Sequence, residues 1–168
     1  MALQGLGQAR ALLILLVLVL APLTSIYFLE PIPIVLVKCN NSMFTVPIPP
    51  KGVLVIYNWT HSVEKTPIVE YYNVTPEGIW LVKALAKSFG AGHPYSAEEL
   101  GGRYSLENGY MVYTAHYYIG PRLEAMGPHE YTAMVVIGAP LNVTCKGVDH
   151  LILEVVNASR ASLLLGLR

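Results

Sequence analysis

The hydrophobic pattern of the chain changes once, close to its N-terminus. Residues 11–29 contain no charged side chain and follow Arg10, and residues 12–20 are apolar on all sides. These nineteen residues, at about 1.5 Å of helix rise each, just span the hydrocarbon core of a bilayer. The pattern therefore predicts a short N-terminal segment (1–10), a transmembrane anchor or signal segment (11–29) and one β-domain (30–168).

The positive charge of Arg10 predicts the orientation of the apolar segment. Positive residues stay on the cytoplasmic side, so we expect the β-domain to lie outside the cytoplasm of a single-pass membrane protein. A cleaved signal peptide is the alternative, with an apolar core at 11–20 and the small residues Thr24 and Ser25 near the cut. That alternative gives a secreted domain, but the segment has no clear A-x-A cleavage pattern, which favours the anchor.

The remainder of the chain reads as short apolar runs broken by Gly, Pro and Asn. The runs are rich in Val, Ile, Tyr and Trp, a composition that favours β-strands. Their ranges are 34–38, 53–60, 67–74, 79–89, 110–119, 131–137 and 151–156. Without any βαβ alternation, they predict an all-β fold, an antiparallel sandwich or small barrel. The run 79–89 is ambiguous, because Lys83 and Lys87 also have the i, i+4 spacing of a helix.

Two cysteines, Cys39 and Cys145, lie far apart in the sequence. In an exported chain an even number of cysteines indicates a disulfide. Two free buried thiols are the other interpretation. A two-cysteine metal site is disfavoured, because the chain has no C-x-x-C pair.

Five of the seven asparagines begin an N-x-S/T sequon, more than chance predicts. Such sequons accept glycans only in exported proteins, so they predict an extracytoplasmic glycoprotein, with coincidence of composition as the alternative. The candidate acceptors are Asn40, Asn58, Asn73, Asn142 and Asn157.

The sequons also predict which face of each strand is buried. A glycan points to solvent, so outward Asn58 and Asn73 send their strand neighbours inward. The residues predicted to face inward on these strands are Val55, Tyr57, Trp59, His61, Ile68, Glu70, Tyr72 and Val74. On the next strand, outward Lys83 and Lys87 predict that Trp80, Val82, Ala84, Ala86 and Ser88 face inward.

Polar residues gather where these strands end, in the run HSVEKTP from His61 to Pro67 and the run SFGAGHP from Ser88 to Pro94. A hairpin between His61 and Glu70 can set the two side chains next to each other, and a Gly-rich loop allows close approach of a ligand. The candidate ligand-binding residues are His61, Ser62, Glu64, Glu70, Ser88, Gly90, Gly92 and His93.

Four interpretations of this cluster stay open. His61 and Glu70 can form a buried structural pair, or the cluster can bind a small organic acid. A metal site would use His61, Glu64 and His93, although no tight H-x-x-x-H spacing supports it. Hydrolysis would use Ser62, His61 and Glu70, but adjacent residues of a strand point to opposite faces. We assign no catalytic residue and no cofactor.

The strings HSVEKTP, a downstream glutamate and SFGAG resemble the signature of the uncharacterised domain-of-unknown-function family eighteen-fifty, closely over residues 53–94. The resemblance implies a short exported or anchored protein, often encoded near tripartite solute transporters of the TRAP type. It implies no activity.

These observations predict a non-catalytic accessory domain, anchored in the membrane, that binds a small solute, a solute-binding protein or a TRAP-type transporter component. An extracytoplasmic enzyme or metal-binding protein using His61, Glu64, Glu70 and His93 is one alternative, and a purely structural cell-surface protein is another. The net charge is zero, with 11 basic and 11 acidic residues, and no basic patch occurs, so nucleic acid is not an expected partner.

Overall fold

The structure is a computed structural model that describes residues 2–61, 64–87, 102–126, 133–139 and 143–165. The chain forms two compact units, one of residues 1–32 with 157–168 and the other of residues 33–156. The helices are α1 (Ala2–Leu29) and α2 (Arg160–Leu164). The strands are β1 (Pro31–Cys39), β2 (Ser42–Pro47), β3 (Val53–Thr60), β4 (Pro67–Thr75), β5 (Gly78–Ala86), β6 (Arg103–Glu107), β7 (Tyr110–Gly120), β8 (Arg122–Met126), β9 (Ala133–Ile137), β10 (Val143–Val148) and β11 (His150–Ser159).

Helix α1 is long and apolar enough to cross a membrane. Its window Leu12–Leu29 has a mean hydropathy of 2.7 and no buried residue. The hydroxyl group of Thr24 is satisfied within the helix, because Oγ1 donates to the carbonyl oxygens of Leu20 and Ala21, each at 2.9 Å. Internal hydrogen bonding of this kind suits a segment surrounded by lipid.

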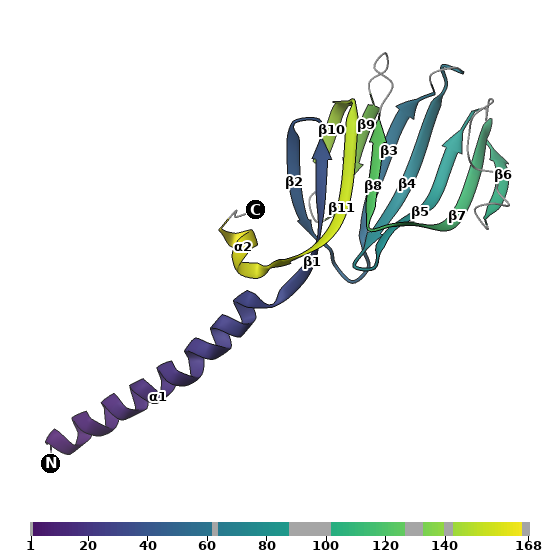
Figure 1. Ribbon diagram of the computed structural model, residues 1–168. Helices are drawn as coiled ribbons and strands as arrows, with labels where there is room; N and C mark the ends of the chain where they lie inside the picture. Colours follow the sequence, from purple (N-terminus) through teal and green to yellow (C-terminus); the bar gives the residue numbers. More distant parts are fainter. Residues whose placement is uncertain (1, 62–63, 88–101, 127–132, 140–142, 166–168) are drawn as a thin grey trace. The chain divides into compact units, whose positions relative to one another are not determined.

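The β-strands form two sheets, shown in Figure 1. One sheet has the order β2-β1-β11-β8 and the other has the order β10-β9-β3-β4-β5-β7-β6. One shared hydrophobic core joins them, with Val35, Val37 and Leu151 from the first sheet and Val55 and Ile137 from the second. The predicted all-β antiparallel sandwich is therefore confirmed.

The described parts of the seven predicted strand segments lie in strands, except for Lys87, which follows the end of β5. The 79–89 run forms strand β5, which resolves its ambiguity with a helix. The pattern did not predict β2, β6, β8 or β10. Strand β6 was missed because all five of its residues are exposed, so no hydrophobic alternation marks it.

The predicted alternation is confirmed on β3 and β4 and breaks on β5. Strand β4 alternates strictly, with Ile68 and Val74 among its buried residues. On β5, Ala84 and Ala86 are buried as predicted, whereas Trp80 and Val82 are not. The reason is a β-bulge: Lys83 pairs with Tyr71 but Leu81 pairs with Tyr72, so Val82 is an extra residue that reverses the faces. Ser88 lies outside the described residues.

Cys39 and Cys145 form a disulfide, with a Cα–Cα distance of 6.5 Å. Cys39 ends β1 in the four-stranded sheet, and Cys145 lies in β10 of the seven-stranded sheet. The bond therefore joins the two layers of the sandwich. This confirms the predicted pairing and excludes two free thiols.

Loss of this disulfide should destabilise the sandwich strongly. The two cysteines are separated by 106 residues, and the chain-entropy model gives about 4–5 kcal/mol for a closed loop of this length. We expect the Cys39→Ala, Cys145→Ala double variant to lose about 2–5 kcal/mol of unfolding free energy in urea denaturation. A reductant should destabilise the wild type to a similar extent and leave the double variant unchanged. Equal stability of both proteins without reductant would contradict the prediction.

Candidate functional site

The described part of the predicted site lies around the β3–β4 hairpin. His61 follows β3 and Glu70 lies in β4, and both are buried, at 8% and 7% exposure. Glu64 is exposed on the turn between the strands. Five predicted site residues lie outside the described residues, namely Ser62, Ser88, Gly90, Gly92 and His93.

Glu70 is a carboxylate in the interior of the protein. Its Oε2 atom accepts a hydrogen bond from Trp59 Nε1 at 3.1 Å and another from the Tyr72 hydroxyl at 2.8 Å. The register places Tyr57 directly opposite Glu70. Among the described residues, no hydrogen-bond donor reaches the other carboxylate oxygen, Oε1. One oxygen is therefore fixed by two donors.

Burial controls the charge of this site. Removal from water raises the pKa of Glu70 above its ordinary value of 4.5, and this outweighs the hydrogen bonds from Tyr72 and Trp59, which lower it. Burial also raises the pKa of Tyr57 to about 12, with the negative charge of Glu70 as the second cause. Glu70 therefore holds its proton at a higher pH than an exposed glutamate, and a protonated carboxyl group can donate as well as accept.

The local backbone fixes the orientation of His61. The N–H of His61 donates to the carbonyl of Thr66 at 2.9 Å, and the N–H of Lys65 donates to the carbonyl of His61 at 2.9 Å. The backbone N–H of Glu64 donates to His61 Nδ1 at 3.2 Å. Because Nδ1 accepts, a neutral His61 carries its proton on Nε2.

The expected direct pair of His61 and Glu70 is wrong. In the register Glu70 lies opposite Tyr57, and the His61–Thr66 hydrogen bond sets His61 four residues further along the hairpin. Trp59, in β3, lies between His61 and Glu70. Its ring stacks on that of His61 with centroids 6.0 Å apart, and its N–H bonds to Glu70. The prediction that both side chains face the interior is confirmed. However, the hairpin turn is too close to His61 for the two side chains to be cross-strand neighbours.

The two predicted carboxylates, Glu64 and Glu70, differ in their surroundings. Glu64 is exposed on the turn, whereas Glu70 is buried behind the rings of Tyr57, Trp59 and Tyr72. In the described part of the chain, no group of three or more His, Cys, Asp or Glu side chains can hold a metal ion. The arrangement instead buries one carboxyl group among aromatic rings.

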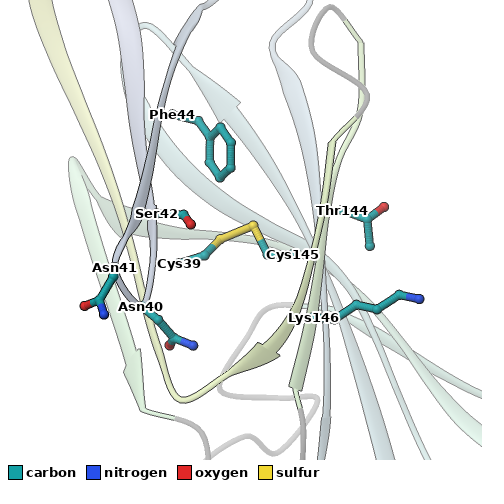
Figure 2. A pocket seen from close by; sticks show the side chains of 8 residues that line it. All are labelled: Cys39, Asn40, Asn41, Ser42, Phe44, Thr144, Cys145 and Lys146. Atoms are coloured by element: carbon teal, nitrogen blue, oxygen red, sulfur yellow. A yellow bond between two sulfur atoms is a disulfide. The ribbon is translucent and has the colours of Figure 1, made fainter.

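A second candidate is a pocket of about 370 Å³ beside the disulfide, shown in Figure 2. It lies where the β1–β2 turn faces β10, so both sheets contribute to it. The lining residues are Cys39, Asn40, Asn41, Ser42, Phe44, Thr144, Cys145 and Lys146. Sequence reasoning did not predict this pocket, although the cysteine pairing indicates which two segments meet there. The lining includes amide and hydroxyl groups and one ammonium group, so the pocket is largely polar.

Asn40 ties the same turn to the β10–β11 turn. Its Oδ1 accepts from the backbone N–H groups of Asp149 at 2.8 Å and His150 at 3.0 Å, and its Nδ2 donates to the carbonyl of Gly147 at 2.6 Å. The backbone of Asn40 has a positive φ of 52°, which asparagine tolerates better than most residues. Because a glycan attaches to Nδ2, this structural role and glycosylation at Asn40 compete.

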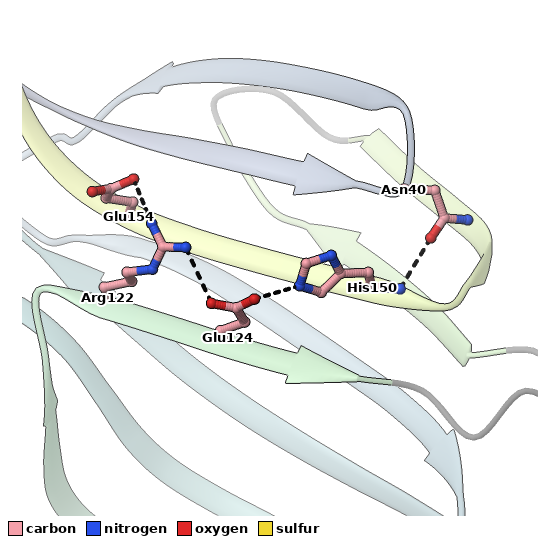
Figure 3. Close-up of polar contacts among 5 residues, drawn as sticks. All are labelled: Asn40, Arg122, Glu124, His150 and Glu154. Atoms are coloured by element: carbon pink, nitrogen blue, oxygen red, sulfur yellow. Dashed lines mark hydrogen bonds and ion pairs between the residues drawn. The ribbon is translucent and has the colours of Figure 1, made fainter.

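Figure 3 shows that polar contacts continue from Asn40 across β11 and β8. His150 Nε2 lies 2.7 Å from Glu124 Oε1, and Arg122 bridges Glu124 at 3.1 Å and Glu154 at 3.2 Å. Hydrogen bonds from Arg122 and then His150 hold the pKa of Glu124 below its ordinary value. These side chains are exposed, so the network contributes little to stability.

The other candidate glycosylation sites differ in exposure. Asn58 and Asn73 alternate with buried residues of β3 and β4 and so lie on the outer face of the seven-stranded sheet. Asn157 is exposed in β11, and Asn142 lies outside the described residues.

Fold and site together define a disulfide-linked β-sandwich domain, preceded by an apolar helix, with a buried carboxyl group on its inner face. The model of the family "Domain of unknown function (DUF1850)" matches residues 55–135. The chain resembles that family over this range, which contains His61, Glu70 and strand β4. No curated protein and no solved structure matches the chain.

Glu70 should make the stability of the protein depend on pH. A carboxyl group whose pKa is raised in the folded state stabilises the fold below its unfolded pKa, and this contribution is lost as pH rises through the folded pKa. Glu70→Gln keeps the shape without the charge. We expect the stability of this variant relative to wild type to increase as pH rises from 4.5, measured by urea denaturation at several pH values.

Glu64→Gln is the matched control, because Glu64 is exposed on the same hairpin. It should follow the wild-type pH dependence. Parallel stability curves for Glu70→Gln and wild type would show that Glu70 does not titrate as proposed.

Asn40 should contribute to stability through its side-chain amide. Asn40→Gly accepts the positive φ, so it isolates the loss of the three side-chain hydrogen bonds. We expect a loss of about 1–3 kcal/mol, because backbone N–H groups lose their acceptor. The neighbouring Asn41→Ala should change stability by less than about 0.5 kcal/mol, since Asn41 is exposed. Equal effects of the two substitutions in thermal or urea unfolding would contradict the assigned role.

Proposed function

We propose that the chain is a non-catalytic, membrane-anchored accessory domain outside the cytoplasm that binds a small solute or a component of a TRAP-type transporter. Three features support the location. The apolar window of α1 has no buried residue, Arg10 precedes it, and the β-domain contains a disulfide. Disulfides persist in oxidising compartments, and a charge before an apolar span keeps the N-terminus in the cytoplasm. A secreted form after cleavage is the alternative.

The observation that carries the binding function is Glu70 itself. Burial of a carboxyl group costs stability, and a purely structural sandwich would place an apolar residue at this position. Instead, Trp59 and Tyr72 hold one of its oxygens, and no described residue bonds to the other. Such a conflict with packing is typical of a functional position.

The raised pKa of Glu70 favours a small carboxylic acid as the solute. A neutral carboxyl group can donate its O–H from Oε1 to a carboxylate, whereas an ionised Glu70 repels the same anion. The aromatic rings beside it provide apolar walls, as small-molecule sites generally do. The separation of exposed Glu64 from buried Glu70 favours binding over acid–base catalysis, which needs converging groups.

The transporter component rests on the family resemblance, since members of the family are often encoded beside TRAP-type transporters. A domain held at the outer membrane surface by α1 would meet solute close to a membrane carrier. In this role the sandwich either presents its solute to the carrier or contacts a carrier subunit directly.

Calorimetric titration of the detergent-solubilised full chain with a panel of small carboxylic acids tests this function. We expect at least one acid to bind, with an affinity that falls as pH rises through the pKa of Glu70. Glu70→Gln should remove that pH dependence, because an amide neither ionises nor repels the anion. Glu64→Gln should bind like the wild type. Absence of binding across the panel, or an unchanged pH dependence in Glu70→Gln, would contradict solute binding at Glu70.

A further inference from the structure

The C-terminal helix α2 belongs to the same compact unit as α1. Arg160, its first residue, holds it against the end of α1. The guanidinium carbon lies 4.2 Å from the centre of the Tyr27 ring, and Nη2 lies 3.3 Å from Glu30 Oε2. An arginine stacked on an aromatic ring and paired with a carboxylate is held in both position and orientation.

Two leucines at the C-terminal end of α2 are largely exposed. Leu164 is 74% exposed and Leu165 is 70% exposed. The helix has five residues, whereas isolated helices shorter than about 12 residues are marginal in water. Its N-cap is well made, because Ser159 Oγ accepts from Ser162 N at 3.1 Å, but the cap does not explain the exposed leucines.

We propose that α2 is a second membrane contact, which lies in the interface of the same bilayer that α1 spans and places Leu164 and Leu165 among the lipids. The occupant follows from the Arg160 contacts. Tyr27 lies two residues before the end of the apolar window, about 3 Å along the helix axis, so the start of α2 is fixed at the depth where the span leaves the hydrocarbon core. Tyrosine is enriched at that depth.

The charges at this position also suit the interface. Glu30 neutralises Arg160, which lowers the cost of bringing a cation near the hydrocarbon. A short helix with leucines on its outer side is stabilised where the leucines enter the boundary between headgroups and acyl chains. The proposal rests on the membrane anchor of the proposed function, and it adds a contact made by the opposite end of the chain.

Depth-dependent fluorescence quenching in the full-length protein tests this contact. Single cysteines replace Leu164, Leu20 or Asn157, with the native disulfide kept oxidised, and each is labelled with NBD. The proteins are reconstituted in phosphatidylcholine–phosphatidylglycerol vesicles that carry a spin label either near the headgroup or deep in the acyl chain. Leu20 reports the anchor, and exposed Asn157 in the same unit is the aqueous control.

We expect the deep quencher to act most on Leu20, the shallow quencher to act most on Leu164, and neither to act on Asn157. Arg160→Gln should reduce quenching at Leu164 toward the Asn157 level and leave Leu20 unchanged. Quenching at Leu20 without quenching at Leu164 would overturn the proposal and keep the anchor. A Leu164 probe that is blue-shifted but unquenched would place the leucines against protein and also overturn it. No quenching at Leu20 would refute the anchor, and the second contact with it.

Discussion

The whole sandwich depends on the burial of one face of each sheet against the other. Alternation along β3 and β4 makes this possible, and the core residues come from both layers. Among the described residues, the buried polar or charged side chains are His61 and Glu70. Both lie on the hairpin that this alternation defines. The alternation that builds the fold therefore also places two polar side chains in the interior, where their burial costs stability.

That cost is offset locally. Glu70 receives hydrogen bonds from Trp59 and Tyr72, and Trp59 in turn stacks on His61. The indole thus connects the two buried polar groups that the register keeps apart. An aromatic ring therefore stands between the two buried polar groups.

Much of the fold follows from the sequence because it depends on short-range periodicity. Residue spacing predicted the faces of β3 and β4, and the two cysteines predicted the link between layers. The bulge at Val82 could not be predicted, because an extra residue in one strand leaves no mark in composition, and it reversed Trp80. The exposed strand β6 lacks the alternation that marks a strand.

The site was predicted less completely than the fold. The alternation of side chains along each strand predicted that His61 and Glu70 share one face. Their separation along the hairpin depends on the register, which the turn sets. The role of Asn40 was hidden for a different reason. Its partners, Gly147, Asp149 and His150, are more than a hundred residues away, and only the packed sandwich brings them together.

The proposed function depends on Glu70 being a buried carboxyl group with a raised pKa. The most direct measurement is carbon-13 NMR of the Glu70 side-chain carboxyl group in the detergent-solubilised full chain, titrated with pH and then with small carboxylic acids. We expect a titration midpoint above the ordinary 4.5 and a change in the resonance when a solute binds. A midpoint at or below 4.5, with no response to any acid, would contradict it.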